Sequence, residues 1–136
     1  MPLDPQVLKK VDIFSSLDDN EAKKIAPLFK ERSYSAGEAM AEEGQHGIGF
    51  FVIESGSAKV TIGGAERARL GPGSHFGEIA LIDDGARTAT VTAETDVTAH
   101  VLVAWDFRPL VKEDADLAWG LLQGVAAILR QHQADH

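Results

Sequence analysis

Regularly spaced glycines divide residues 33 to 103 into short runs of β-branched and apolar residues, a pattern that limits the possible folds strongly. Short strands separated by turn residues are typical of an all-β sandwich or barrel. Gly63 and Gly64 lie between two such runs, and paired glycines favour a tight hairpin. The runs are Ile48–Ile53, Ala58–Ile62, Ala65–Leu70, Thr88–Val91 and Val97–Val103.

Helical periodicity flanks this region on both sides. Asp18 is predicted to cap a first helix, with Glu21 three residues later as the second half of a capping box. After Trp105 the period becomes helical again, and Asp106 is predicted to cap a short helix. The apolar face of the first helix comprises Ala22, Ile25, Leu28 and Phe29. That of the last helix comprises Leu117, Leu121, Leu122, Val125, Ile128 and Leu129.

The expected order is therefore helix, about eight short strands, then helix. At 136 residues the chain has the length of one ordinary domain. We predict a single domain over residues 1–136, with a helical part at 1–32, a β-barrel at 33–104 and C-terminal helices at 105–136. Met1 and the domain-length layout favour a free-standing domain, although a fragment of a larger protein would look the same.

Gly120 and Gly124 interrupt the last helix. Each costs about 1 kcal/mol of helix propensity relative to alanine. Two glycines four residues apart also form a smooth strip that another backbone or a ligand can approach closely. A second copy of the same helix is one candidate for the partner of this strip.

The charge balance limits the partners. Twenty-one acidic and 13 basic residues give a net charge of −8, which argues against direct binding of nucleic acid or an anionic membrane. The chain has no cysteine, which excludes zinc-thiolate sites and thiol nucleophiles and fits a reducing compartment. It shows neither a signal peptide nor a run of ~20 apolar residues. We expect a soluble cytoplasmic protein.

One segment carries a specific chemistry. Glu78 and Arg87 lie nine positions apart, and small residues such as Gly77, Ala80 and Ala89 leave the nearby backbone N–H groups open. A guanidinium matches two phosphate oxygens, whereas a carboxylate repels phosphate and accepts a hydrogen bond from a hydroxyl. These parts suit a ribose phosphate, with the phosphate near the N-terminus of a short helical turn at 79–82.

A simpler interpretation stays open for the same residues. Arg87 could be a surface residue paired with Asp83 or Asp84, and such pairs contribute little in solvent. Glu78 could merely favour a helix start.

Two blocks in this region resemble the phosphate-binding cassette of cyclic nucleotide-binding domains. They are Phe76-Gly77-Glu78-Ile79-Ala80-Leu81-Ile82 and Arg87-Thr88-Ala89-Thr90-Val91. The family includes regulatory subunits of cyclic-AMP-dependent protein kinase, the catabolite activator protein and nucleotide-gated channels. Asp12 to Leu17 resembles the family's entry into its first helix, and Phe50 to Val60 its central strand–turn–strand.

The resemblance implies a β-jelly-roll barrel (a double-stranded β-helix) with N-terminal helices and a C-terminal lid helix. It implies that Glu78 accepts from the ribose 2′-hydroxyl and that Arg87 pairs with the cyclic phosphate. The backbone N–H groups of Ala80 and Thr88 would bind the same phosphate, and Gly77 would keep the backbone near the ribose. The full set of implied ligand-binding residues is Phe76, Gly77, Glu78, Ile79, Ala80, Arg87, Thr88 and Ala89.

The base end is less determined. By position in the family, residues 129 to 133 would cap the base, with Leu129 over a purine face and His132 or Gln133 at its edge. Leu129 could instead be an ordinary core residue and His132 a frayed terminal residue. A hydroxyl residue such as Thr88 often accompanies cyclic GMP in this family, yet many members that bind cyclic AMP keep it. Cyclic AMP is the expected ligand, with cyclic GMP as the alternative.

The expected function is a non-catalytic sensor whose C-terminal helix switches when the nucleotide binds, without a metal. Its partner would be an unidentified effector protein or a second subunit. Two alternatives remain. A degenerate, ligand-free interaction module would have lost Glu78 or Arg87, and both are present. A cupin-type metalloenzyme would need converging histidines, and His46, His75 and His100 do not match the cupin spacing.

Overall fold

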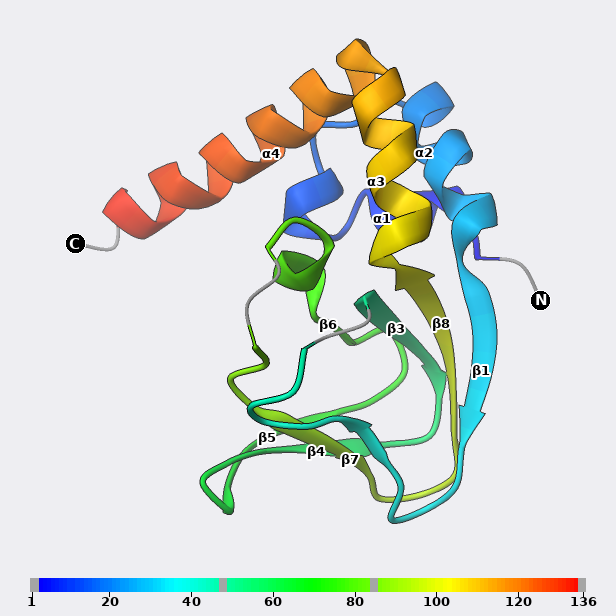
Figure 1. Cartoon of the computed structure of the whole chain (residues 1–136), viewed down its shortest axis with the longest axis vertical. Helices are drawn as coiled ribbons and strands as arrows, with labels where there is room; N and C mark the ends of the chain where they lie inside the picture. The colour runs from blue at the N-terminus through cyan, green and yellow to red at the C-terminus, as the bar shows by residue number, and fades with distance from the viewer. Residues whose placement is uncertain (1–2, 47–48, 84–85, 135–136) are drawn as a thin grey trace. The chain divides into compact units, whose positions relative to one another are not determined.

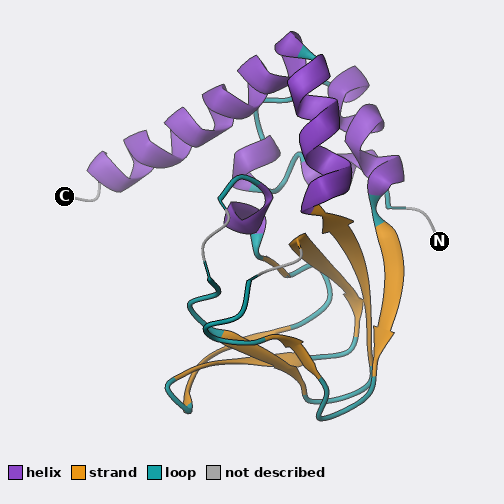
Figure 2. Ribbon diagram, viewed as in Figure 1, coloured by secondary structure: helices purple, strands orange, loops and turns teal. Residues whose placement is uncertain are grey.

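All the β-strands lie in one stretch of the chain, with helices before and after it (Figure 2). The structure is a computed structural model that describes residues 3–46, 49–83 and 86–134. Its contacts divide the chain into two compact units. The β unit spans Lys30–Ala104, and the helical unit combines the chain up to Phe29 with the chain from Trp105.

The β unit consists of two four-stranded antiparallel sheets (Figure 1). Residues from both sheets, including Phe51, Val101, Met40 and Val91, form one buried apolar cluster. This arrangement confirms the predicted jelly-roll fold, although the strands form two separate sheets and not a closed barrel. The first sheet has the order β1 (Lys30–Tyr34), β8 (Val97–Val103), β3 (Gly49–Ser55) and β6 (His75–Phe76). The second has the order β2 (Ala39–Ala41), β7 (Thr90–Ala93), β4 (Ala58–Ile62) and β5 (Ala65–Leu70).

The strand predictions agree with the structure for three of the predicted runs. The predicted bounds of β4, β5 and β8 are confirmed. Gly63 and Gly64 turn the β4–β5 hairpin with φ of 58° and 83°, the left-handed conformation that favours glycine. The run predicted at 88–91 is shifted, since β7 begins at Thr90 and leaves Thr88 in a loop. β1 begins at Lys30, earlier than the expected start at residue 33, and Ile48 lies outside the described residues.

The helical unit begins with short elements. They are α1 (Pro5–Leu8), a 3₁₀ turn at Asp12–Phe14, α2 (Asp19–Ile25) and a second 3₁₀ turn at Ala26–Leu28. Asp18 and Glu21 form the predicted capping box, with each side chain accepting from the other residue's backbone N–H. The prediction that the helix continues to Leu28 and Phe29 is wrong. Pro27 lies in the second 3₁₀ turn, and proline cannot donate the hydrogen bond that would extend an α-helix.

Two longer helices complete this unit, α3 (Ala104–Glu113) and α4 (Ala115–Ala134). The prediction that Asp106 caps α3 is wrong, because the helix starts directly after β8 and Asp106 lies in its first turn. An acidic residue in the first turn still favours the helix through the dipole. Phe107 of α3 packs edge-on against Phe14, with ring centroids 6.2 Å apart.

The glycine strip of α4 faces the chain's own N-terminal segment and not a second copy of the helix. A Cβ on Gly120 would lie 2.8 Å from Cδ2 of Leu17, and one on Gly124 would clash with the backbone carbonyl of Ile13. Both glycines are buried, and Leu117 and Leu121 on the same side of the helix are buried with them. The glycines therefore allow the segment at 12–17 to pack tightly against α4.

Within the described residues, no helix combines the length and apolar character that crossing a membrane requires.

Candidate functional site

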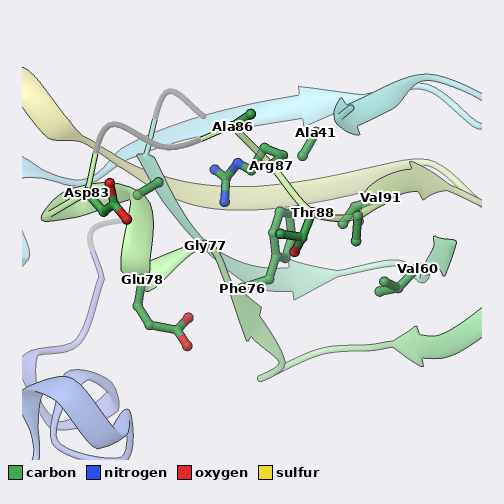
Figure 3. Close-up of a pocket in the computed structure, with 12 residues that line it drawn as sticks. Ala41, Val60, Phe76, Gly77, Glu78, Asp83, Ala86, Arg87, Thr88 and Val91 are labelled. Atoms are coloured by element: carbon green, nitrogen blue, oxygen red, sulfur yellow. The ribbon is translucent and has the colours of Figure 1, made fainter. Parts of the chain in front are cut away.

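A cavity of about 330 Å³ opens in the β unit beside the predicted cassette (Figure 3). Its volume is at the lower end of the range of about 300–1,000 Å³ that is typical of small-molecule sites. Seven of the eight predicted ligand-binding residues line this cavity, and the eighth, Ile79, belongs to the turn Glu78–Leu81 that borders it. The lining residues are Ala41, Val60, Phe76, Gly77, Glu78, Ala80, Asp83, Ala86, Arg87, Thr88, Ala89 and Val91.

Arg87 is held in the wall of this cavity through its backbone and its side chain. Its N–H donates to the Gln45 carbonyl at 2.8 Å, and its own carbonyl accepts from Gly44 at 3.0 Å. One Nη2–H group donates to the Gly49 carbonyl at the start of β3. The side chain is half-buried, so the interpretation of Arg87 as a surface residue is wrong. Asp84, one of the suggested surface partners, lies outside the described residues.

The guanidinium retains capacity to bind an anion. Among the described residues, no group accepts a hydrogen bond from its buried Nε–H. Burial lowers the pKa of Arg87, while the negative charge of Glu78 opposes this shift. Arginine nevertheless remains charged at any physiological pH. A positive group with a buried, unsatisfied donor in a largely apolar cavity favours an anionic ligand.

Gly77 makes the close approach of Arg87 possible. Its φ is +88°, a conformation that side chains disfavour. A Cβ at this position would clash with Nη1 of Arg87 and lie 2.7 Å from the Gly49 carbonyl oxygen. Glycine is therefore required here for two independent reasons, the backbone conformation and the space that the guanidinium occupies.

Glu78 begins the 3₁₀ turn Glu78–Leu81, and its carboxylate extends away from the Arg87 guanidinium (Figure 3). Its Oε2 lies 3.8 Å from Nδ1 of His75. The nearby His75 side chain is the largest cause that lowers the pKa of Glu78, ahead of the smaller effect of Arg87. Glu78 is therefore ionised at neutral pH, and the cavity presents a negative group and a positive group in different places.

The other predicted residues occupy less polar parts of the site. Phe76 stacks on Phe51, with ring centroids 4.6 Å apart and planes 7° from parallel. Thr88 is exposed and Ala89 is half-buried. The backbone of Ile79 lies in the 3₁₀ turn, where the N–H of Ala80 donates to the Gly77 carbonyl at 3.0 Å. A phosphate would have to share this N–H with the turn.

Sequence reasoning missed one wall of the cavity. Val60 pairs with Val91 across β4 and β7, and Val91 pairs with Ala41 across β7 and β2. These residues form an apolar row over three strands that are distant in sequence. The alternating pattern at 58–62 indicates that Val60 has a preferred face, but only the strand register shows which residues meet it.

The suggested base contacts belong to α4 in the helical unit. Leu129 is 57% exposed, so the alternative of ordinary core packing is wrong for this residue. His132 lies with Asp12, Ser15 and Ile128 around a second cavity of the helical unit. Contacts of Leu129 and His132 with a base stay predictions.

The three histidines considered for a metal site belong to different elements. His46 follows β2, His75 is in β6 and His100 is in β8, where it approaches Glu54 at 3.3 Å. Within residues 3–46, 49–83 and 86–134, no three His, Asp or Glu side chains gather as a metal site would require.

Two curated relatives are protein kinases or their subunits. A cAMP-dependent protein kinase regulatory subunit from Yarrowia lipolytica is 39% identical over 106 residues, which are 76% of this chain and 28% of that protein. A cGMP-dependent protein kinase from Caenorhabditis briggsae is 41% identical over 93 residues, which are 64% of this chain and 12% of that protein. The chain thus spans about a quarter or less of these relatives.

Solved structures match more of the chain. The N-terminal domain of a transcriptional regulator from Streptomyces coelicolor is 31% identical with a TM-score of 0.82, and the match covers 96% of this chain and 94% of that one. The regulatory domain of Toxoplasma gondii PKA, crystallised with cAMP, is 25% identical with a TM-score of 0.70, covering 97% of this chain and 49% of that one.

The family model for the cyclic nucleotide-binding domain matches residues 31–114, which include both sheets and the whole cavity lining. This match agrees with the fold and with the presence of Glu78 and Arg87 in the lining of one cavity. The chain belongs to the cyclic nucleotide-binding domain family.

Proposed function

We propose that this chain binds a cyclic purine nucleotide, cyclic AMP in the first instance, in the cavity of the β unit. The observation that carries the proposal is the half-buried Arg87 guanidinium, whose Nε–H has no acceptor among the described residues. Its Nε–H and free Nη donors suit the phosphate oxygens in the bidentate geometry that arginine favours. The negative overall charge of the chain makes such a local positive group necessary for holding an anion.

The remaining roles follow from chemistry and position. Glu78, ionised and away from Arg87, is suited to accept a hydrogen bond from the ribose 2′-hydroxyl. The hydroxyl and N–H of Thr88 are exposed beside Arg87 and can add donors to the phosphate. Phe76, Ala89 and the apolar row across β2, β7 and β4 would contact the sugar and the base. Ile79 and Ala80 contribute their backbone in the turn.

The identity of the base is the least constrained part of the proposal. Relatives named for cyclic AMP and for cyclic GMP are similarly identical to the chain. Thr88 offers a hydroxyl that either nucleotide can use. We therefore propose cyclic AMP as the ligand, with cyclic GMP as the alternative. Direct competition between the two nucleotides for the protein measures which of them binds more tightly.

A thermal-unfolding experiment tests the binding proposal. Cyclic AMP at about 100-fold above its dissociation constant should stabilise the protein by about 2.7 kcal/mol, because it binds only the folded state. Linear 5′-AMP should stabilise it much less, since its phosphate carries more charge and a different shape. No shift with cyclic AMP or cyclic GMP would contradict the proposal and favour a ligand-free interaction module.

The biological role we propose is regulatory and non-catalytic. Ligand binding would shift the equilibrium between two positions of α4. The size of that shift is limited by the difference between the ligand's affinities for the two states. An effector protein or a second subunit would respond to that change. The proposal draws on family membership and on the regulatory names of the relatives.

Two tryptophans provide a test of this switch. Trp105 at the start of α3 and Trp119 in α4 are 72% and 64% exposed, and they are the only tryptophans in the sequence. If the helices repack on binding, saturating cyclic AMP should reduce the acrylamide quenching of tryptophan fluorescence by about twofold as exposed indole is covered. Identical quenching with and without ligand, measured under conditions where binding is verified, would exclude this switch.

A further inference from the structure

His75 is the residue of the β unit that most directly influences Glu78. It lies in β6 opposite Val52 of β3, and its ring centroid is 5.6 Å from that of Phe50. Its Nδ1 atom is buried and lies 3.8 Å from Oε2 of Glu78. The His75 ring therefore lies near the Phe50 ring of β3, and its Nδ1 atom lies close to the Glu78 carboxylate.

The β6–Gly77–turn geometry creates this proximity. His75 begins the two-residue strand β6 and Glu78 begins a 3₁₀ turn, with Gly77 in the left-handed conformation between the two elements. This bend brings two side chains that are three residues apart to within 3.8 Å of each other, beside the cavity that Glu78 lines. The imidazolium, or the neutral tautomer with a proton on Nδ1, presents an N–H group to the carboxylate.

Fixing the carboxylate in advance should increase affinity. The Glu78 side chain is 34% exposed, so it would otherwise sample several rotamers, and ordering such a side chain costs conformational entropy. A group that orders it before the ligand arrives removes part of that cost. The direction of the pKa shift of Glu78, caused mainly by His75, is consistent with this contact.

We propose that His75 is a positioning residue that holds the Glu78 carboxylate within hydrogen-bonding reach of the 2′-hydroxyl of the bound ribose. The inference rests on the proposed binding of a cyclic nucleotide in this cavity. It makes His75 a determinant of how strongly the site distinguishes a ribose from a 2′-deoxyribose, without contact between His75 and the ligand.

The test compares binding of cyclic AMP and 2′-deoxy cyclic AMP by calorimetry. A hydrogen bond to a charged group contributes about 1.5–3 kcal/mol, so the wild type should prefer the ribose form by about tenfold or more. His75→Leu should lower this preference to about threefold or less, while affinity for the deoxy form stays within about twofold. His75→Asn, whose amide nitrogen can replace Nδ1, should retain most of the preference.

Further variants separate positioning from a general structural effect. His75→Gln, which moves the donor away from the Nδ1 position, should behave as His75→Leu and serves if that variant does not fold. Glu78→Ala, which removes the acceptor, should lose the preference, and adding His75→Leu to it should change the preference no further. His100→Asn, which breaks the other histidine–glutamate contact of the same sheet, should leave the preference at its wild-type value.

The outcomes are distinguishable. Equal weakening of both nucleotides by His75→Leu, with the wild-type preference intact, overturns the positioning role and leaves the proposed function standing. A wild-type protein that binds neither nucleotide overturns the proposed function and this inference together.

Discussion

Arg87→Ala should weaken cyclic AMP binding by about 100- to 10,000-fold. Two charge-assisted hydrogen bonds to phosphate contribute about 1.5–3 kcal/mol each, and alanine removes both. Arg87→Lys keeps the charge but not the planar fork, so its loss should be smaller, by about 10- to 100-fold. Isothermal calorimetry with cyclic AMP measures the dissociation constants of all three proteins.

The control for this change is Arg69→Ala. Arg69 is an exposed arginine of β5 whose partners are Glu66 at 3.3 Å and Glu94 at 3.5 Å, and its removal should leave the affinity unchanged within about twofold. Because Arg87 also donates to the Gly49 carbonyl, circular dichroism must confirm that Arg87→Ala remains folded. A folded Arg87→Ala protein with wild-type affinity would refute the assignment of the phosphate to this residue.

Gly77→Ala should destabilise the protein by about 2–5 kcal/mol and weaken nucleotide binding at least tenfold. The left-handed φ costs a side chain about 1–2 kcal/mol, and inserting a methyl group into occupied space costs about 1–3 kcal/mol more. The methyl group would displace the Arg87 guanidinium, because that is the atom group it meets. Urea unfolding gives the stability change, and calorimetry gives the loss of affinity.

Gly73→Ala separates the two causes. Gly73 has the same φ of +88°, but a Cβ there would meet no atom within 4 Å. The free energy of unfolding of Gly73→Ala should fall only by the cost of the left-handed φ, about 1–2 kcal/mol. This variant should bind cyclic AMP as the wild type does. Equal stability of the Gly77→Ala and Gly73→Ala proteins would show that the contact with Arg87 costs nothing.

The parts of the fold that could be predicted are those with a local cause. Alternating side chains located β4, the glycine pair located its hairpin, and the Asp18–Glu21 pair located the start of α2. The errors arose where a neighbouring element determines where a helix begins or ends. Pro27 ends α2 before the apolar period does, and β8 continues directly into α3 without a polar cap.

The same distinction separates the residues of the candidate site that could be predicted from those that could not. Glu78 and Arg87 were found because their chemistry is concentrated in one short segment of the sequence. Ala41, Val60 and Val91 were not found, because strand register brings them together and no local pattern encodes register between distant strands. The influence of His75 on Glu78 also depends on the reversal at Gly77, which spacing alone does not reveal.

The tight packing of Gly124 on Ile13 has a consequence for signalling. The missing side chain lets the backbone of the N-terminal segment lie directly on α4, so neither can slide past the other without losing this fit. A displacement of this part of α4 would therefore carry residues 12–17 with it as one body. Under the proposed switch, the N-terminal segment would therefore move together with α4, and a partner that contacts residues 12–17 would sense the same change as one that contacts α4.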